Sequence, residues 1–289
     1  MEAAEISVCP RAGVFQSIAA RWKHFIDPDQ RIGIWRDSEV FGYEHQPNSK
    51  GRHHGREFDV WYSIDANGCR YSPDVRKLDS TVDVSFLGCS WTFGHGVADG
   101  ESFPAVIART TGLMCENHGV MGWGTAHALL KLREIIHRDR LPKKVIYSLL
   151  PDHITRNASR KSWVRGIAKY GRRHPHFMIA NGELCNHGLC CDVDIIPDSE
   201  SDLHQLELEL TGSMITEMGN ACRKADIEFF VVILKGHLPF PICRTLISAA
   251  TKTIDLTHIK IQAFRGDHHP NPDDHCRLAA AMLQEDSIF

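Results

Sequence analysis

The stretch DVSFLGCSWTFGHGVADGESFPAVIARTTGL, residues Asp83 to Leu113, decides the fold. Its first part alternates polar and apolar residues as a strand does, and an amphipathic run typical of a helix follows. Between them, Gly88-Cys89-Ser90 forms a tight corner. Parallel α/β sheets bind ligands beyond the carboxyl ends of their strands. Ser90 and Cys89 are therefore candidate reactive groups, although a serine after a glycine is also typical of a bend or a helix cap.

From Asp83 onward, short β-rich runs alternate with longer amphipathic runs, which favours a parallel sheet with helices on both faces. We expect strands at Val82–Leu87, Met114–His118, Lys144–Leu150, Glu228–Leu234 and His258–Phe264. We expect helices at Ser102–Thr111, Thr125–Arg138, Ser201–Lys224, Pro241–Thr251 and Pro272–Gln284. The predicted fold class is α/β, a three-layer α/β/α sandwich with a mostly parallel five-stranded sheet.

Two segments interrupt this alternation. Residues 1–80 mix aromatic residues, Gly and Pro, and predict an irregular, β-rich N-terminal extension with one or two hairpins. Residues 81–289 form the core domain, with an inserted loop region at 157–198. Within the insertion, Asn181-Gly182 is a strong hairpin signal. Insertions of this length often serve as lids or binding loops.

The composition excludes several function classes. The 289 residues are 43% hydrophobic, with a formal net charge of −3, so charge gives no reason to expect a nucleic-acid or membrane partner. The N-terminus lacks the pattern of a secretory signal, and the ten cysteines then indicate reduced thiols in a cytoplasmic protein. The run CNHGLCC (185–191) fits no familiar zinc spacing, so we expect neither metal nor cofactor. The oligomeric state stays open.

Other predicted strands also end in chemically useful residues. Glycines Gly119, Gly122 and Gly124 follow the second strand, and the pair Asp152-His153 follows the third. Asp267 and His269 follow the fifth. Because the carboxyl ends of parallel strands meet at one edge, these groups are expected to converge there.

In this order the blocks resemble those of the SGNH, or GDSL-type, hydrolase family. The first, Gly-Asp-Ser-x-Thr-x-Gly, is matched by residues 88–94, with Cys89 in place of the aspartate. The second is matched by Asn117, Gly119, Gly122, Gly124 and Thr125, and the last by Asp267, His269, Pro270 and Asn271. The resemblance covers residue 83 to the C-terminus, extends more faintly to the upstream run YSIDANGCRYSP (62–73), and implies a flavodoxin-like SGNH fold.

The resemblance implies a role for each matched residue. Ser90 would be the nucleophile, His269 its base, and Asp267 the group that orients the imidazole. The oxyanion hole would combine the Ser90 and Gly122 amides with a side chain at position 152. Cys89 would be a small buried filler.

Two departures from the family pattern bear on the chemistry. The usual Asp-x-x-His spacing would place the acid at Gly266, whereas Asp267 stands one residue closer to His269. Alignment on Arg156 puts Asp152 where the family has an oxyanion-hole asparagine. An ionised carboxylate would repel an oxyanion, and losing one donor costs about 3–4 kcal/mol. Burial could keep Asp152 protonated, the Ser90 and Gly122 amides could stabilise the oxyanion without it, or His153 could replace it as the donor. Alternatively, the Asp152-His153 pair could have a different function, or catalysis could be impaired.

The expected function is ester hydrolysis through an acyl-Ser90 intermediate, on O-acyl or acetyl esters of carbohydrates or on other small esters. The alternatives are an O-acyltransferase and a catalytically impaired binding protein of the same fold. Trp91 and Trp123 could stack on sugar rings. A cleft over the site could be lined by Arg156, Arg160, Trp163, Arg165, Arg172 and Arg173.

Overall fold

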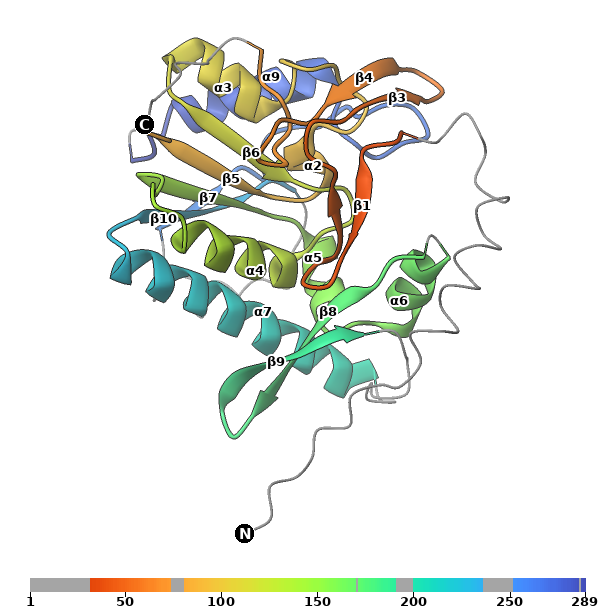
Figure 1. Ribbon diagram of the computed structural model, residues 1–289, viewed down its shortest axis with the longest axis vertical. Helices are drawn as coiled ribbons and strands as arrows, with labels where there is room; N and C mark the ends of the chain where they lie inside the picture. Colours follow the sequence, from red (N-terminus) through yellow and green to blue (C-terminus); the bar gives the residue numbers. More distant parts are fainter. Residues whose placement is uncertain (1–31, 74–80, 170, 191–199, 236–251, 286) are drawn as a thin grey trace.

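The central sheet of the computed structural model contains five parallel strands, which confirms the expected fold class (Figure 1). The structure describes residues 32–73, 81–169, 171–190, 200–235, 252–285 and 287–289. The strand order is β11-β10-β7-β5-β6. The strands are β5 (Val84–Gly88), β6 (Cys115–Gly119), β7 (Lys144–Leu149), β10 (Glu228–Ile233) and β11 (Lys252–Asp255). In chain order this is the flavodoxin-like arrangement 2-1-3-4-5, whose switch point lies beside β5.

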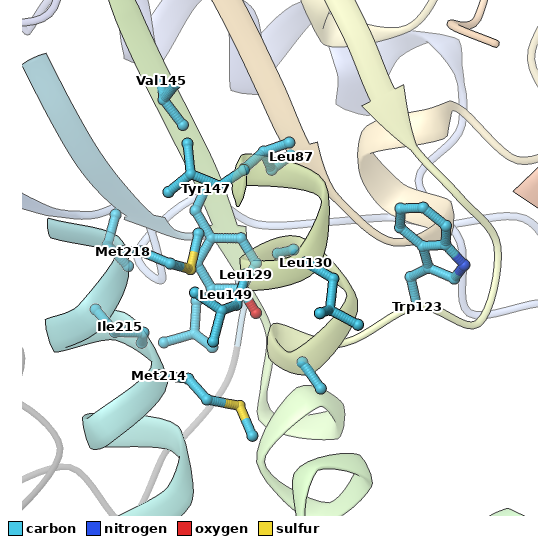
Figure 2. Packing of buried hydrophobic residues seen from close by; sticks show 14 of the residues in the cluster. Leu87, Trp123, Leu129, Leu130, Val145, Tyr147, Leu149, Met214, Ile215 and Met218 are labelled. Atoms are coloured by element: carbon cyan, nitrogen blue, oxygen red, sulfur yellow. The ribbon is translucent and has the colours of Figure 1, made fainter. Parts of the chain in front are cut away.

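Helices cover both faces of the sheet (Figure 1). The helices α4 (Thr125–Ile136) and α7 (Glu200–Lys224) pack on one face, and α3 (Phe103–Thr111) and α9 (Pro272–Leu283) on the other. Because successive strand residues point to opposite faces, Leu87 joins the first core and Phe86 the second. Figure 2 shows Leu87, Val145, Tyr147 and Leu149 facing Met214, Ile215 and Met218. Burial on both sides explains why these strands are almost entirely apolar.

Two N-terminal hairpins lie at the carboxyl end of the sheet (Figure 1). The first joins β1 (Trp35–Ser38) to β2 (Gly42–His45), and the second joins β3 (Lys50–His54) to β4 (Asp59–Ser63). The Trp123 indole, on the loop after β6, donates a hydrogen bond to the Tyr43 carbonyl at 3.2 Å. The Tyr62 ring packs edge-on against Phe93. The hairpins therefore contact the loops that follow β5 and β6.

The insertion contains regular structure. The helices α5 (Pro151–Asn157) and α6 (Lys161–Ala168) precede a hairpin of β8 (His174–Ala180) and β9 (Glu183–Cys190). Ala180 pairs with Glu183, so the connection is the two residues Asn181 and Gly182, with φ angles of 53° and 80°. This left-handed pair is what a tight hairpin requires, and the predicted turn is confirmed.

One predicted strand is wrong. The fifth strand is β11 at Lys252–Asp255, whereas His258–Phe264 forms no strand. The backbone amides of Gln262 and Ala263 donate to the Asp274 carboxylate at 3.0 and 2.8 Å, so a side chain takes the place of a neighbouring strand. The helix predicted at Pro241–Thr251 lies outside the described residues.

Candidate active site

The corner after β5 places Ser90 at the start of the short helix α2 (Ser90–Phe93). Cys89 follows the strand as the N-cap residue with an extended backbone, so the helix begins directly at the serine. The amides of a first helical turn lack intrahelical partners and are available to other acceptors. Asn117, on β6, fixes the corner because its side-chain amide donates to the Thr92 carbonyl at 2.8 Å and accepts from the Gly119 amide at 2.9 Å. A Cβ at Gly119 would lie 2.3 Å from the Phe93 nitrogen, so only glycine permits this approach.

Arg70 also holds this corner, and sequence reasoning missed it. Its guanidinium donates to the carbonyls of Phe93, Gly94 and Val97 at 2.8–3.1 Å and pairs with Asp99 at 2.9 Å. Arg70 is only 3% exposed. An arginine is rarely buried to this degree unless its guanidinium is paired, as it is here. The only sequence signal was its position in the segment that resembles the family most faintly.

The structure brings the three predicted triad residues together. Ser90 Oγ lies 2.8 Å from His269 Nε2, and His269 Nδ1 hydrogen-bonds Asp267 Oδ1. Asp267 Oδ1 also accepts from the backbone amide of His269 at 3.1 Å. A carboxylate only accepts, so Nδ1 carries the ring proton in the neutral imidazole and Nε2 is left to accept from the serine. With the spacing Asp-x-His, one turn therefore places both the Asp267 carboxylate and the His269 imidazole in the site.

The surroundings keep the imidazole neutral. Burial first, and then the neighbouring His95, lower the pKa of His269 from 6.5 to about 4, although Asp267 opposes the shift. The pKa of Asp267 is held below its usual range by hydrogen bonds, first from His95 and then from His269. At neutral pH the site thus pairs a neutral base with an ionised acid.

His95 is the second residue that sequence reasoning missed. Its Nε2 lies 3.1 Å from Asp267 Oδ2, and its ring stacks on His269 with centroids 4.0 Å apart. It follows α2 in the run Gly94-His95-Gly96, and nothing in the sequence connects it with a loop about 170 residues later.

The second glycine block forms a loop beside the corner. Gly122 has a φ of 84°, and a Cβ there would lie 2.5 Å from the Tyr43 hydroxyl and 3.7 Å from the Trp163 ring. The Tyr43 hydroxyl donates to the Met121 carbonyl at 3.0 Å, which fixes the loop. The predicted oxyanion-hole residue is therefore held by the first hairpin and flanked by the insertion.

The pair Asp152-His153 differs from the expectation. Asp152 is exposed, so the burial that would keep it protonated is absent. His153 is fully buried and its Nδ1 lies 2.8 Å from the Tyr147 hydroxyl, while burial and then Arg156 lower its pKa well below 6.5. His153 is a neutral core residue, which argues against its serving as the substitute oxyanion donor.

Cys89 and the two tryptophans are core residues. Cys89 is 1% exposed, and burial raises the pKa of its thiol. Trp91 is 5% and Trp123 1% exposed, and Trp123 belongs to the core cluster of Figure 2, where it lies to one side of the other labelled residues. A ring buried on both faces cannot stack on a sugar, so that expectation is wrong for both tryptophans.

Only some of the insertion's side chains lie near the glycine loop. Arg156 donates to the Trp123 carbonyl at 2.6 Å and lies over the Trp163 ring at 4.4 Å, while Arg172 lies over Tyr43 at 4.4 Å. Arg160 instead pairs with Glu207 and Arg173 with Glu39, and Arg165 is exposed on α6. Of the six side chains expected to line a cleft, three therefore lie near the glycine loop, namely Arg156, Trp163 and Arg172.

Two clusters among the described residues have metal-ligating groups close together: His95, Asp267 and His269, and Cys69, Glu116 and His118. In both, the ligand atoms already bond one another; His118 Nε2, for example, lies 2.9 Å from Glu116, which also pairs with Arg138. A metal would have to break these bonds, including the one that orients His269. The absence of a metal stays a prediction.

A cavity of about 260 Å³ lies elsewhere, between the first hairpin and α4, and none of the triad residues lines it. Its charged residues neutralise one another, since Arg36 pairs with Glu44 at 3.2 Å and Lys131 with Glu134 at 2.7 Å. These four charged side chains therefore offer a ligand in the cavity no unpaired charge.

Comparisons with known proteins give only distant structural matches. No model of a protein family matches the chain, and neither does any curated protein. Similar solved structures include a member of the lipolytic protein G-D-S-L family from Veillonella parvula (12% identity, 72% of this chain and 99% of that chain, TM-score 0.40). Another is the psychrotrophic esterase EstA from Pseudoalteromonas sp. (11% identity, 71% of this chain and 97% of that chain, TM-score 0.45). A third is the salicylyl-acyltransferase SsfX3 (13% identity, 73% of this chain and 57% of that chain, TM-score 0.34). At these values similarity says nothing about the reaction, which must be argued from the side chains. No described helix has the length and apolarity that crossing a membrane requires.

Proposed function

We propose that this chain is a serine ester hydrolase of the SGNH type. The observation that carries the proposal is the continuous hydrogen-bonded series from Ser90 Oγ through His269 to Asp267. Three side chains from opposite ends of the core meet in the order that activates a serine hydroxyl.

The reaction follows from this geometry. His269 Nε2 takes the hydroxyl proton as Ser90 Oγ bonds to the ester carbonyl carbon, and the carbonyl electron pair moves to oxygen. The amides of Ser90 and Gly122 would stabilise the oxyanion. As the intermediate collapses, the ester C–O bond breaks and His269 returns the proton to the leaving alcohol. Water then attacks the acyl-Ser90 carbonyl while His269 takes a proton from it. As the bond between the acyl carbon and Ser90 Oγ breaks, His269 returns that proton to Oγ, which releases the acid and restores the serine.

Exposure of the triad favours hydrolysis over transfer. The side chains of His269 and Asp267 are 26% and 30% exposed, so water reaches the base directly. Acyl transfer to an alcohol would benefit from a site that excludes water. We propose O-acyl or acetyl esters of carbohydrates, or other small esters, as substrates.

A fluorophosphonate probe and an ester panel test the proposal. We expect one equivalent of phosphonate on Ser90, abolished in Ser90→Ala and strongly slowed in His269→Ala, and hydrolysis of acyl nitrophenols or acetylated sugars with the same dependence. Exhaustive chelation should leave the rate unchanged if no metal takes part. Partition of the acyl group to an added sugar in preference to water would favour the transferase. A folded protein that neither labels nor turns over an ester would support the binding protein instead.

A further inference from the structure

The acid–histidine loop is held from outside by the segment that follows the nucleophile. Asp267 and His269 lie on the irregular connection between β11 and α9, where Arg265, Gly266 and His268 are exposed. Within the loop, the Phe264 amide donates to the His269 carbonyl at 3.1 Å. Because this backbone contact does not reach the side chain of Asp267, a further contact, or anchor, is needed to keep its carboxylate in line with His269 Nδ1.

His95 supplies that anchor. Asp267 uses Oδ1 for His269, and its other oxygen, Oδ2, lies 3.1 Å from His95 Nε2. The imidazoles of His95 and His269 stack at 4.0 Å with an angle of 25° between their planes. The backbone amide of His95 donates to the Ser90 carbonyl at 3.0 Å, so the anchor is tied to the nucleophile's own turn.

The second N-terminal hairpin holds His95 in turn. The ring of His53 packs edge-on against His95 at 4.8 Å, and Phe58 does so at 5.5 Å. His53 Nδ1 lies 2.9 Å from the Tyr62 hydroxyl, which accepts from the Gly96 amide at 2.8 Å. The hairpin thus fixes the backbone and the side chain of the residue that meets Asp267.

The same hairpin touches the acid–histidine loop directly. Phe58 packs on Phe264 at 5.2 Å, and the Arg265 amide donates to the Glu57 carboxylate. Residues of the N-terminal extension therefore contact both the anchor and the loop it holds.

We infer that His95 is a positioning residue of the proposed hydrolase: it donates Nε2–H to the second carboxylate oxygen of Asp267 and so holds the acid that orients His269. This inference rests on the proposed function. It also accounts for the shortened Asp-x-His spacing, because an acid one residue closer to the histidine is kept in line by a donor from another loop. The second hairpin, β3–β4, then belongs to the active site.

Two variants of full-length protein separate the hydrogen bond from the ring. His95→Gln keeps a terminal N–H donor without the ring, and His95→Phe keeps a stacking ring without the donor. We expect His95→Phe to lower kcat roughly 10- to 100-fold with KM within about threefold, and His95→Gln to recover most of the loss. His268→Gln, an exposed histidine on the same loop, serves as the control and should match the wild type.

A spectroscopic readout keeps the test independent of turnover. The proton shared by His269 Nδ1 and Asp267 should give a downfield ¹H signal at pH 7.5 in the wild type and in His95→Gln, and this signal should broaden or vanish in His95→Phe. An unchanged signal in His95→Phe would overturn the inference even if no ester is ever hydrolysed. Equal losses in both variants, with lowered melting temperatures, would also overturn it, because they would show a merely structural role. If the wild type turns over no ester but the signal behaves as expected, the proposed reaction fails and the positioning role stands.

Discussion

The protein is expected to lose stability steeply at mildly acidic pH, because it buries several neutral histidines. His45, His127, His153, His174 and His275 are at most 2% exposed, and each has at least one ring nitrogen without a partner among the described residues. Burial lowers the pKa of His45, His174 and His275 from 6.5 to about 3, and that of His127 and His153 well below 6.5. At mildly acidic pH these histidines therefore bind protons in the unfolded chain but stay neutral in the folded protein.

The sign and the size follow from linkage. Where the unfolded state binds more protons, the free energy of unfolding rises with pH, so this stability is present above pH 6.5 and is lost as the pH falls towards 3. Between pH 7.5 and pH 5.5 each site costs about 1.4 kcal/mol, and five sites about 7 kcal/mol. A domain is typically stable by about 5–15 kcal/mol, so unfolding is expected near pH 5–5.5 at room temperature.

Urea unfolding at pH 7.5, 6.5 and 5.5 measures this loss. His275→Asn is the matched variant, because the Asn oxygen can replace His275 Nδ1 as acceptor for the Phe103 amide, 3.2 Å away, without taking up a proton. The loss between pH 7.5 and 5.5 should shrink by about 1.4 kcal/mol in that variant. It should stay unchanged in His258→Asn, since His258 is exposed. A total loss of less than about 2 kcal/mol in the wild type would refute the reasoning.

Four further changes test the site. Cys89→Ala should keep kcat/KM within about fivefold of wild type, since a buried, protonated thiol is no nucleophile, and a loss of activity with Ser90 intact would contradict this. Gly122→Ala should lower kcat roughly a hundredfold by displacing the proposed oxyanion amide, whereas Gly182→Ala, with a similar φ but open space around it, should leave kcat unchanged. Asp152 stands where the oxyanion-hole donor is expected, and a carboxylate donates no hydrogen bond when ionised, so Asp152→Asn should raise kcat several-fold; a decrease would show that the carboxylate takes part. Arg156 has no carboxylate partner among the described residues, so Arg156→Leu should reduce kcat/KM roughly tenfold more for an ester bearing a carboxylate than for a neutral one; equal reductions would contradict an anion-binding role.

Much of the core was predictable because its determinants are local. The sequence predicted the strand at Lys144–Leu149, because burial on both faces requires continuous apolar residues. It also predicted the corner at Gly88-Cys89-Ser90, because a tight turn requires small residues. The strand predicted at His258–Phe264 failed because Asp274, a residue of the following helix, takes its amides. Trp91 and Trp123 resemble binding residues in the sequence, and only packing shows that they are buried.

By itself, the order of residues determined the alternation of strands and helices and placed Ser90, Asp267 and His269 after predicted strands, because hydrophobic periodicity and short turn motifs act over a few neighbouring positions. The roles of these three residues came from the resemblance to SGNH hydrolases. Tertiary structure alone decided that His95 binds Asp267, that Arg70 holds the nucleophile's turn and that the hairpin β3–β4 packs against His95. Those contacts join positions far apart in the chain. They depend on which surfaces the folded sheet brings together, and no local pattern records that.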